Sequence, residues 1–495
     1  MWFLVEPWRI IRYGSIRLKV LKSTGDPMLF CFEWSIEQRQ MDREHFHTPL
    51  TEGNILKGIL SFALPLLVGQ IFQLFYSLVD VRIVGEILGE HSLASVGATT
   101  TLSDLLIGLL NGFTNGLAIV IATFYGAGDE KHLKKALGGT IFFGVLGSLM
   151  ITVISILTLP AILNFLNVQD DLVREAGQYI RVILAGLICT AFYNICAAIL
   201  RAVGDSFTPL LFLILASVGN IGLDYLFIGT WGFGVAGAAY ATVISQAVSA
   251  LLCYIYMRRR YPLLRISFED MLPERELSKK LLTSGISMAF MISFVQLGTL
   301  ALQTSINILG EKVIVAHTAA RKATGMFMLP FSVLGSALAT FCGQNLGAGK
   351  PERMRQGILR TVVLTWVWCL AVILFVQGCA PSLIHGITAS TDKMIIDTAC
   401  RYLRFDTAFY FVPAVISLFR NSMQGYGDTK TPVFSSMLEL LGKIAVVLFL
   451  TPKLGYDGII VAEPIVWIIM VIPLIWGMLQ SPAFRKEKGE KALDI

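Results

Sequence analysis

Two aspartates stand inside long apolar runs of this sequence. Asp80 follows Gln73 and Tyr76 by seven and four residues, so the three share one face of a helix. Asn220 stands one helical turn before Asp224. An Asp at the centre of a membrane span costs roughly 2.5–3.5 kcal/mol to insert and normally faces a cavity or a partner. Carboxylate, amide and phenol oxygens suit a sodium ion or a proton, and we predict a cation site. The alternative is that these groups only tie helices together.

A second set of charged residues lies in apolar runs of the other half of the chain. Glu439 and Lys443 are one helical turn apart, and we expect them to neutralise each other. A role in substrate binding or coupling is the alternative for this polar network, which also includes Asp406. For Asp104 and Arg181 the same two interpretations stay open, a structural pairing or a role in substrate binding or coupling. The remaining charges of the set are Arg321, Lys322, Arg420 and Glu463.

The elements that carry these residues must be membrane-spanning helices. Hydrophobic residues make up 55% of the 495 positions and charged residues 15%, whereas soluble chains carry roughly 25% charged residues. This composition excludes an ordinary cytosolic enzyme, a disordered chain and a disulfide-rich secreted module. Apolar runs of about 20 residues or more are long enough to cross a bilayer as helices, and too long for barrel strands. Twelve such runs occur, at approximately 57–83, 92–124, 136–159, 176–200, 208–229, 235–257, 280–307, 313–343, 357–379, 395–420, 432–451 and 458–479.

The distribution of Lys and Arg predicts how the runs are oriented. The loops after even-numbered runs are rich in both residues, as at 131–135 and 258–280, and loops after odd-numbered runs hold few. Short loops rich in Lys and Arg stay in the cytoplasm. We therefore expect both termini in the cytoplasm. The expected divisions are an N-terminal cytoplasmic segment at 1–52, an N-lobe at 53–257, a cytoplasmic linker at 258–279, a C-lobe at 280–480 and a cytoplasmic tail at 481–495.

The two halves resemble each other. Gly89–Glu90 recurs as Gly310–Glu311, and the turn at 126–128 recurs at 347–349, each 221 positions later. A Gly-Asp-x-x-Thr-Pro turn at 204–209 recurs at 427–432, and Gly232 recurs as Gly455, each 223 positions later. A nearly constant offset across six helices indicates duplication. Since each half has an even number of spans, we expect a pseudo-two-fold axis along the membrane normal. In the paired turns we expect Gly to permit the tight turn, Thr to cap the N-terminus of the next helix and Pro to begin that helix.

Other features narrow the function. The eight cysteines are scattered without a C-x-x-C pair, which predicts buried thiols rather than a disulfide or metal site. The sequence has no nucleophile–base set and no phosphate-binding G-x-x-x-x-G-K-[ST] loop, so we expect neither an enzyme nor an ATP-driven pump. Residues 1–40 fit neither a span nor a signal peptide. They form either a basic amphipathic anchor at 7–22 or, as we prefer, sequence upstream of a true start at Met41.

These motifs together resemble the multidrug and toxic compound extrusion (MATE) family, over residues 50–480. The resemblance is carried by Pro65 and Asp80 in the first run, by the turns at 126–130 and 347–351, and by the paired Gly-Asp-x-x-Thr-Pro turns. It implies twelve helices in two six-helix lobes around a central cavity. In the family, the first helix is thought to bend or straighten with the ionisation of its Asp. Pro65 would be the hinge, and a fixed kink is the alternative.

The resemblance also implies a branch and a site. In the DinF-like branch the N-lobe cation site falls here on Asp80, Asn220, Asp224 and Thr242. The cavity residues of that branch fall on Gln73, Tyr76 and Tyr179. The NorM-like branch uses an acidic residue in helix 7, but the run at 280–307 contains no Asp or Glu.

The function implied by this resemblance is antiport driven by sodium or protons. We expect export of organic, often cationic, or lipophilic drugs across the cytoplasmic membrane by a monomer without cofactor, ATP or nucleic acid. Sodium would bind at Asp80, Asn220, Asp224 and Thr242. A flippase for lipid-linked precursors of the same superfamily is the alternative. A major-facilitator transporter would lack the paired turns, and an ion channel would need a filter-like stretch that the sequence does not have.

Overall fold

The computed structural model of the chain describes residues 12–13, 16–17, 50–165, 170–271 and 274–485. It falls into two compact units, Met1–Phe46 and His47–Ile495. In the first unit, β1 (Arg12–Tyr13) pairs antiparallel with β2 (Ile16–Arg17). Only these four residues of the predicted anchor at 7–22 are described, and they form a hairpin rather than a helix. The proposed start at Met41 lies outside the described residues.

The second unit consists of helices. The first half of the sequence forms α1 (Ile55–Leu88), α2 (Glu90–Ala127), α3 (Glu130–Phe165), α4 (Asp170–Ala202), α5 (Phe207–Asp224), η1 (Tyr225–Thr230) and α6 (Val235–Arg260). Two short 3₁₀ turns, η2 (Pro262–Leu264) and η3 (Phe268–Met271), follow in the linker. We call α1–α6 with η1 the N-lobe.

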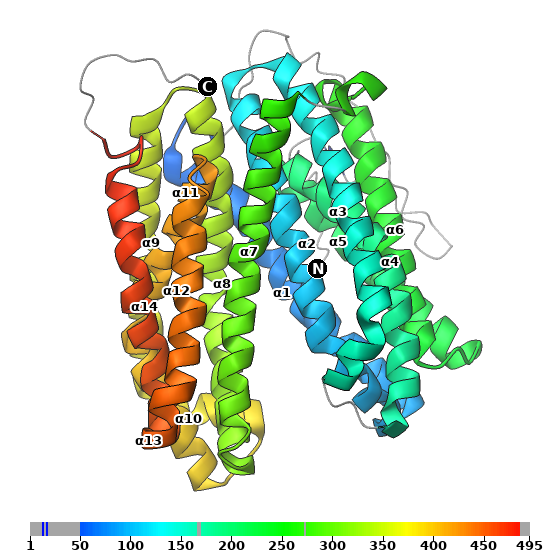
Figure 1. The fold of residues 1–495 in the computed structure, drawn as a ribbon, viewed down its shortest axis with the longest axis vertical. Helices are drawn as coiled ribbons and strands as arrows, with labels where there is room; N and C mark the ends of the chain where they lie inside the picture. Colours follow the sequence, from blue (N-terminus) through cyan, green and yellow to red (C-terminus); the bar gives the residue numbers. More distant parts are fainter. Residues whose placement is uncertain (1–11, 14–15, 18–49, 166–169, 272–273, 486–495) are drawn as a thin grey trace, which may run out of the picture. The chain divides into compact units, whose positions relative to one another are not determined.

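The second half of the sequence forms what we call the C-lobe. Its helices are α7 (Arg275–Ile306), α8 (Glu311–Gly347), α9 (Pro351–Thr388), α10 (Lys393–Ala408), α11 (Phe411–Gly425), α12 (Lys430–Ala445), η4 (Val446–Leu450), α13 (Thr451–Leu454) and α14 (Tyr456–Leu479). In Figure 1, α9, α12 and α14 lie on one side and α3–α6 on the other, with α1, α2, α7 and α8 between them.

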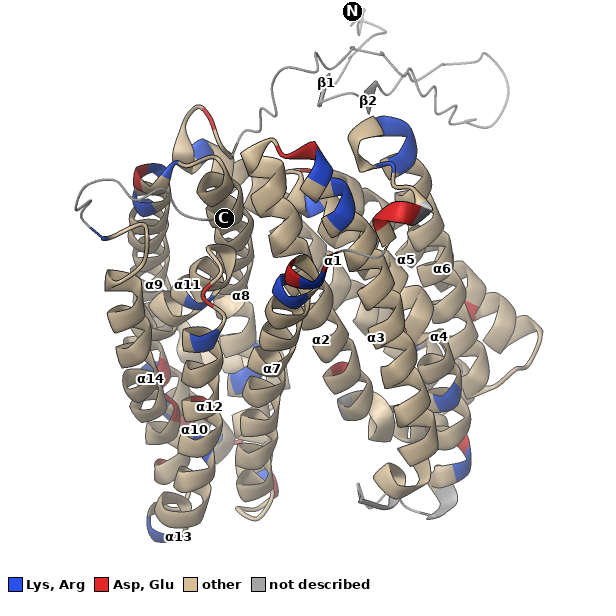
Figure 2. Cartoon of the chain, turned by 45° about the horizontal axis from the view of Figure 1, so that its top comes forward, with Lys and Arg blue, Asp and Glu red and all other residues tan. Residues whose placement is uncertain are grey.

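The predicted membrane architecture is confirmed. Among the described residues, eleven helical segments are long and apolar enough to span a bilayer, and the bent pair α10 and α11 makes a twelfth. The long middle stretches of α3 and α9 carry almost no charge (Figure 2). The twelve predicted runs correspond to these spans in order. This is an all-helical, multi-pass membrane protein.

Three of the spans are not regular α-helices. The run predicted at 395–420 bends by 57° between α10 and α11. Pro413 stands in the first turn of α11, where it has no N–H to donate to the preceding helix. The helices at the two repeated positions, α5 and α12, each continue into a π-helix, η1 and η4. π-Helical turns are rare and frequently occur at functional sites.

The paired Gly-Asp-x-x-Thr-Pro turns differ from the prediction in one respect. Gly204 and Gly427 have φ of 97° and 92°, as the tight turn requires. The cap, however, comes from the Asp and not from the Thr. Asp205 Oδ1 accepts from the backbone N–H of Thr208 at 3.0 Å, and Asp428 Oδ1 accepts from that of Thr431 at 3.1 Å. An ionised carboxylate satisfies the free N–H groups of a helix start and favours its dipole, which explains the difference.

The two lobes pack closely through glycines near one end of α2. A Cβ atom at Gly126 would overlap the carbonyl oxygen of Gln344 on α8, and one at Gly116 would overlap that of Ser284 on α7. The Ser284 hydroxyl donates to the Gly116 carbonyl at 2.7 Å. The repeated Gly-Ala-Gly turn therefore serves lobe packing, because Gly347 in turn lies against the backbone of Thr123.

Helix α1 belongs to both lobes. The segment just before it is held by the first turn of α9, where Arg353 donates to the carbonyl oxygens of Leu50, Glu52 and Gly53 at 3.1, 2.7 and 2.9 Å. The first turns of α1, including Ile59, are buried in the core cluster of the C-lobe. Its last turns, including Ile83, are buried in an N-lobe cluster. Pro65 lies between these two parts of an unbroken helix.

Candidate functional site

The predicted cation site assembles in the N-lobe from three helices. Helix α1 contributes Tyr76 and Asp80, and α5 contributes Asn220 and Asp224 in its last turns. Helix α6 contributes Thr242. Asn220 and Asp224 are buried, with 1% and 0% of their surface exposed. The one-turn spacings in the sequence thus direct these side chains toward a common site.

Asn220 is the centre of the hydrogen bonding at this site. In the amide orientation that satisfies its neighbours, its Nδ2 donates to Asp224 Oδ2 at 3.0 Å and to the Tyr76 hydroxyl at 2.8 Å. Its Oδ1 accepts from the backbone N–H of Thr242 at 3.0 Å. One amide therefore links α1, α5 and α6.

The carboxyl groups of Asp80 and Asp224 contact each other. The Oδ1 atom of each is buried and has no hydrogen-bond donor among the described residues. Two ionised carboxylates in contact repel, and a shared proton or a cation between them removes the repulsion. Tyr179 of α4 is close enough to interact electrostatically with both. The arrangement is thus chemically suited to binding a proton or a sodium ion.

Two of the predicted residues are placed less directly. Gln73 is exposed on α1 and makes no hydrogen bond within the described part of the chain, so its place in the cavity stays a prediction. The Thr242 hydroxyl donates to the Ala238 carbonyl of its own helix at 3.1 Å. Its oxygen lone pair remains available to a cation, and the backbone of Thr242 reaches Asn220 as described above.

The predicted pairing of Glu439 and Lys443 is present in the C-lobe. Lys443 Nζ lies 2.9 Å from Glu439 Oε1, and both residues are buried. Arg420 of α11 lies 3.2 Å from the other oxygen of Glu439. Glu439 is therefore shared by two buried cations. Asp406, also buried, has a different partner: its Oδ2 accepts from Thr324 at 3.4 Å, and its Oδ1 has no donor among the described residues.

The sequence did not predict the second ion pair of the C-lobe. Arg321 Nη1 of α8 donates to both oxygens of Glu463 on α14, at 2.8 and 3.0 Å. The Tyr402 hydroxyl of α10 donates to the same carboxylate at 3.2 Å. Both charges had been recognised as lying within apolar runs, but helical spacing does not relate residues 142 positions apart. Asp104 and Arg181 are exposed.

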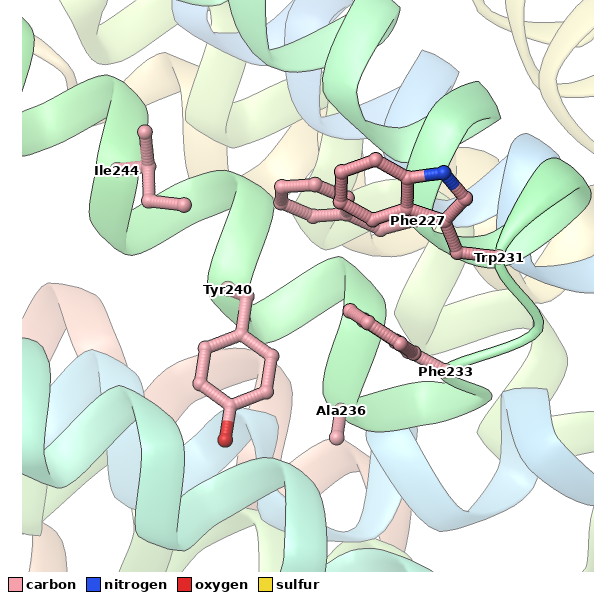
Figure 3. Close-up of a pocket in the computed structure, with 6 residues that line it drawn as sticks. All are labelled: Phe227, Trp231, Phe233, Ala236, Tyr240 and Ile244. Carbon is pink, nitrogen blue, oxygen red and sulfur yellow. The ribbon is translucent and has the colours of Figure 1, made fainter.

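An aromatic hollow of about 530 Å³ lies in the N-lobe, between η1 and α6 (Figure 3). Phe227 and Trp231, in and just after η1, stack with ring centroids 5.1 Å apart, and Phe233 lies 5.7 Å from Trp231. Tyr240 and Ile244 of α6 complete its wall. The hollow contains none of the predicted site residues. Since η1 continues α5 directly after Asp224, Phe227 of the hollow and Asp224 lie on one continuous element.

The chain is similar to known proteins over most of its length. It is 27% identical to the "probable multidrug resistance protein YoeA" of Bacillus subtilis, across 86% of this chain and 94% of the relative. A crystal structure of MATE in the bent conformation matches 87% of this chain and 96% of its own, with a TM-score of 0.81 at 25% identity. An outward-facing multidrug resistance MATE transporter of the MOP superfamily matches 88% and 98%, with a TM-score of 0.81 at 25% identity.

The model of the family described as MatE matches the chain twice. The matches cover residues 65–226 and 287–449, one in each half, as a duplicated transporter requires. They include Asp80 and Asp224 in the first copy and Glu439 and Lys443 in the second. Together the two matches cover well over half of the sequence. The chain therefore belongs to the MatE family of secondary membrane transporters.

Proposed function

We propose that this chain is a cation-coupled antiporter that exports organic, often cationic, compounds across the cytoplasmic membrane. The observation that carries the proposal is the contact between the Asp80 and Asp224 carboxyl groups inside the N-lobe. A buried pair of carboxyls can hold a proton or a sodium ion and release it when the site reaches the other side. The description of the YoeA relative as a probable multidrug resistance protein also supports the proposal.

The coupling site consists of Asp80, Asn220, Asp224 and Thr242, with Gln73, Tyr76 and Tyr179 lining the cavity beside it. A cation bound between the carboxyls removes their repulsion, so it favours close packing of α1 on α5. Release of the cation restores the repulsion and pushes α1 away. The first turns of α1 are fixed to the C-lobe through Arg353. The movement of α1 therefore acts on both lobes. Pro65 is the point where the helix bends.

The same residues favour the DinF-like branch. That branch places its cation site on helices 1, 5 and 6, and the corresponding residues here contact one another through Asn220. We further propose that both termini are cytoplasmic, that 53–257 and 280–480 move as two bodies around the linker 258–279, and that the transporter is a monomer.

The proposal is tested with the purified chain in lipid vesicles under separately imposed sodium and pH gradients. We expect efflux of a fluorescent organic cation only when one of the two gradients drives its ion in the opposite direction to the dye. That gradient identifies the coupling ion. Efflux that is equally fast with neither gradient would contradict antiport. Movement of lipid-linked precursors, but not of organic cations, would instead support the flippase alternative.

A further inference from the structure

Two arginines meet at the end of α6 that adjoins the linker. Arg258 lies in the last turn of this span, and Arg265 lies in the linker directly after η2. The Nε group of Arg265 donates to the backbone carbonyl oxygen of Arg258 at 2.9 Å. The Nη1 group of Arg258 donates to the Tyr254 hydroxyl at 3.2 Å, and its guanidinium lies over the ring of Tyr254. The linker thus turns back and brings a second arginine to the end of the helix.

Neither arginine is neutralised by a carboxylate of the chain that the structure describes. Both are exposed, and neither forms an ion pair with a described residue. Asp205 and Asp270 accept hydrogen bonds from other groups of the linker. Glu269, which is exposed in the same linker, is paired with neither arginine. Arg258 and Arg265 therefore form a small surface of positive charge, which we call the arginine pair.

The contacts of the arginine pair within the chain use only part of its hydrogen-bonding capacity. A basic residue in the last turn of a helix favours the helix dipole, which explains Arg258. Arg265 satisfies a carbonyl oxygen that the end of the helix leaves free. Each guanidinium carries five N–H groups, and the hydrogen bonds to described residues use one nitrogen of each. Both arginines therefore keep donors for an anion outside the chain.

An exposed apolar face of α6 leads to the arginine pair. Val248, Leu251 and Ile255 are 49%, 56% and 37% exposed. They stand three or four positions apart, and Arg258 follows Ile255 by three, so all four side chains share one face of the helix. Helix α6 packs against α4 and α5 and lies on the side of the N-lobe away from α7 and α8 (Figure 1). This face is therefore directed toward lipid and not toward the other lobe.

The arginine pair stands at the level of the lipid headgroups. Helix α6 is long and apolar enough to span the bilayer over Val235–Arg260, which places Arg258 at the end of a span. Tyr254, one turn earlier, lies against Phe192 of α4 with ring centroids 5.9 Å apart. Tyr side chains are enriched where a span reaches the interface. Lipid phosphates occupy the same level, and a guanidinium binds a phosphate through two parallel N–H groups.

We propose that Arg258 and Arg265 bind the phosphate of an anionic phospholipid whose acyl chains lie along Val248, Leu251 and Ile255. The positive charge favours an anionic lipid, because a zwitterionic headgroup carries its own cation beside the phosphate. The apolar face favours a lipid over a free phosphate ion, since only the lipid has chains to cover it. A lipid bound here contacts α6 and the linker together, so it fastens the linker to the N-lobe.

The test follows the melting temperature of the full chain in detergent while phosphatidylglycerol, phosphatidylcholine or sodium phosphate is added. A ligand that binds the folded protein raises its melting temperature as the ligand concentration increases. We expect phosphatidylglycerol to raise it more than an equal concentration of phosphatidylcholine. Sodium phosphate should raise it no more than sodium chloride of the same ionic strength. In Arg258→Gln/Arg265→Gln, the concentration of phosphatidylglycerol that gives half of the rise should increase about tenfold.

The matched control is Lys279→Gln/Lys280→Gln, which removes two exposed cations from the first turns of α7 and changes the net charge equally. It should keep the half-rise concentration of the wild type. An equal increase in the control would show that only overall charge matters and would overturn the inference. Equal effects of the two lipids, or a rise with sodium phosphate as large as with phosphatidylglycerol, would also overturn it. If the double variant does not fold, Arg265→Gln alone decides: a higher half-rise concentration supports the inference and an unchanged one overturns it.

Discussion

At the scale of single residues, the coupling role proposed for Asp80 and Asp224 can be separated from folding. Substitution of either by Asn keeps the side-chain shape and removes the ionisable group, and a neutral amide is cheaper to bury than a carboxylate. We expect gradient-driven efflux from vesicles to be lost in Asp80→Asn and in Asp224→Asn, while the melting temperature stays within a few degrees of wild type.

The matched control is Glu130→Gln, since Glu130 is an exposed carboxylate at the start of α3 of the same lobe and pairs with Lys134 one turn away. It should transport normally. If Asp80→Asn and Asp224→Asn both pump as well as this control, the N-lobe site is wrong and the buried charges of the C-lobe become the candidates for coupling.

Glu439 should matter for stability instead. It lies between Lys443 and Arg420, at 2.9 and 3.2 Å, and all three residues are buried. Glu439→Gln leaves Arg420 without this counter-charge and leaves Lys443 with the more distant Glu463, 3.8 Å away, and breaking a buried ion pair costs about 3–5 kcal/mol. Thermal unfolding in detergent should show a clearly lower melting temperature. The control Glu86→Gln breaks an exposed pair with Arg82 and should change the melting temperature little. Equal melting of the two variants would contradict this view of Glu439.

The sequence predicted those residue clusters that lie within one helix or along one face. Asn220 with Asp224 and Glu439 with Lys443 are each one turn apart, and both pairs are in contact as expected; Tyr76, one turn before Asp80, contacts Asn220. The convergence of α1, α5 and α6 on Asn220 was available only through the family resemblance. The ion pair of Arg321 and Glu463 could not be predicted from the sequence, because it depends on how α8 packs against α14.

At the scale of the elements, all twelve apolar runs proved to be helical spans. Run length and composition decide this, because a backbone inside a bilayer must satisfy its own hydrogen bonds. The interruptions were not predicted. Pro413 was a visible signal for the break between α10 and α11, whereas nothing in the composition of 225–230 and 446–450 distinguishes a π-helix from an α-helix. The side chain that caps the repeated turns was also misassigned, since Thr and Asp both occur in the motif.

Helix α2 offers a test of the close packing between lobes. Two of its glycines differ in their surroundings: a Cβ at Gly126 would overlap the Gln344 carbonyl, and one at Gly97 would meet nothing within 4 Å. Gly126→Ala should destabilise the protein by about 1–3 kcal/mol, because the backbones of α2 and α8 would have to separate. Gly97→Ala should be neutral or stabilising, since Ala favours a helix by up to about 1 kcal/mol. Melting temperatures of both variants decide this, and a Gly126→Ala protein as stable as Gly97→Ala would show that the lobes do not meet there.

At the scale of the whole molecule, the duplicated halves share their architecture and differ in their charge. The repeated turns, the π-helices and the glycine contacts occur in both lobes at offsets of 221 to 223 positions. Among the residues that the structure describes, the pair of neighbouring aspartates is found in the N-lobe and the buried network of cations and carboxylates in the C-lobe. Asymmetry of this kind lets one lobe respond to a small cation while the other contributes to binding of the transported compound. The repeats were readable from the sequence because glycines at turns leave a clear pattern.

The orientation of the molecule is the last prediction. The ends of α6 and α9 that carry several basic residues, at 258–260 and 353–360, are visible in Figure 2, and short loops rich in Lys and Arg remain in the cytoplasm. A fluorescent protein that folds only in the cytoplasm should therefore be bright when fused after Arg265 or after Arg485. It should be dark when inserted at Asp392, which follows an odd-numbered span. A periplasmic phosphatase at the same three positions should give the inverse result, which controls for expression. Phosphatase activity after Arg265 together with fluorescence at Asp392 would reverse the orientation and, with it, the direction of transport.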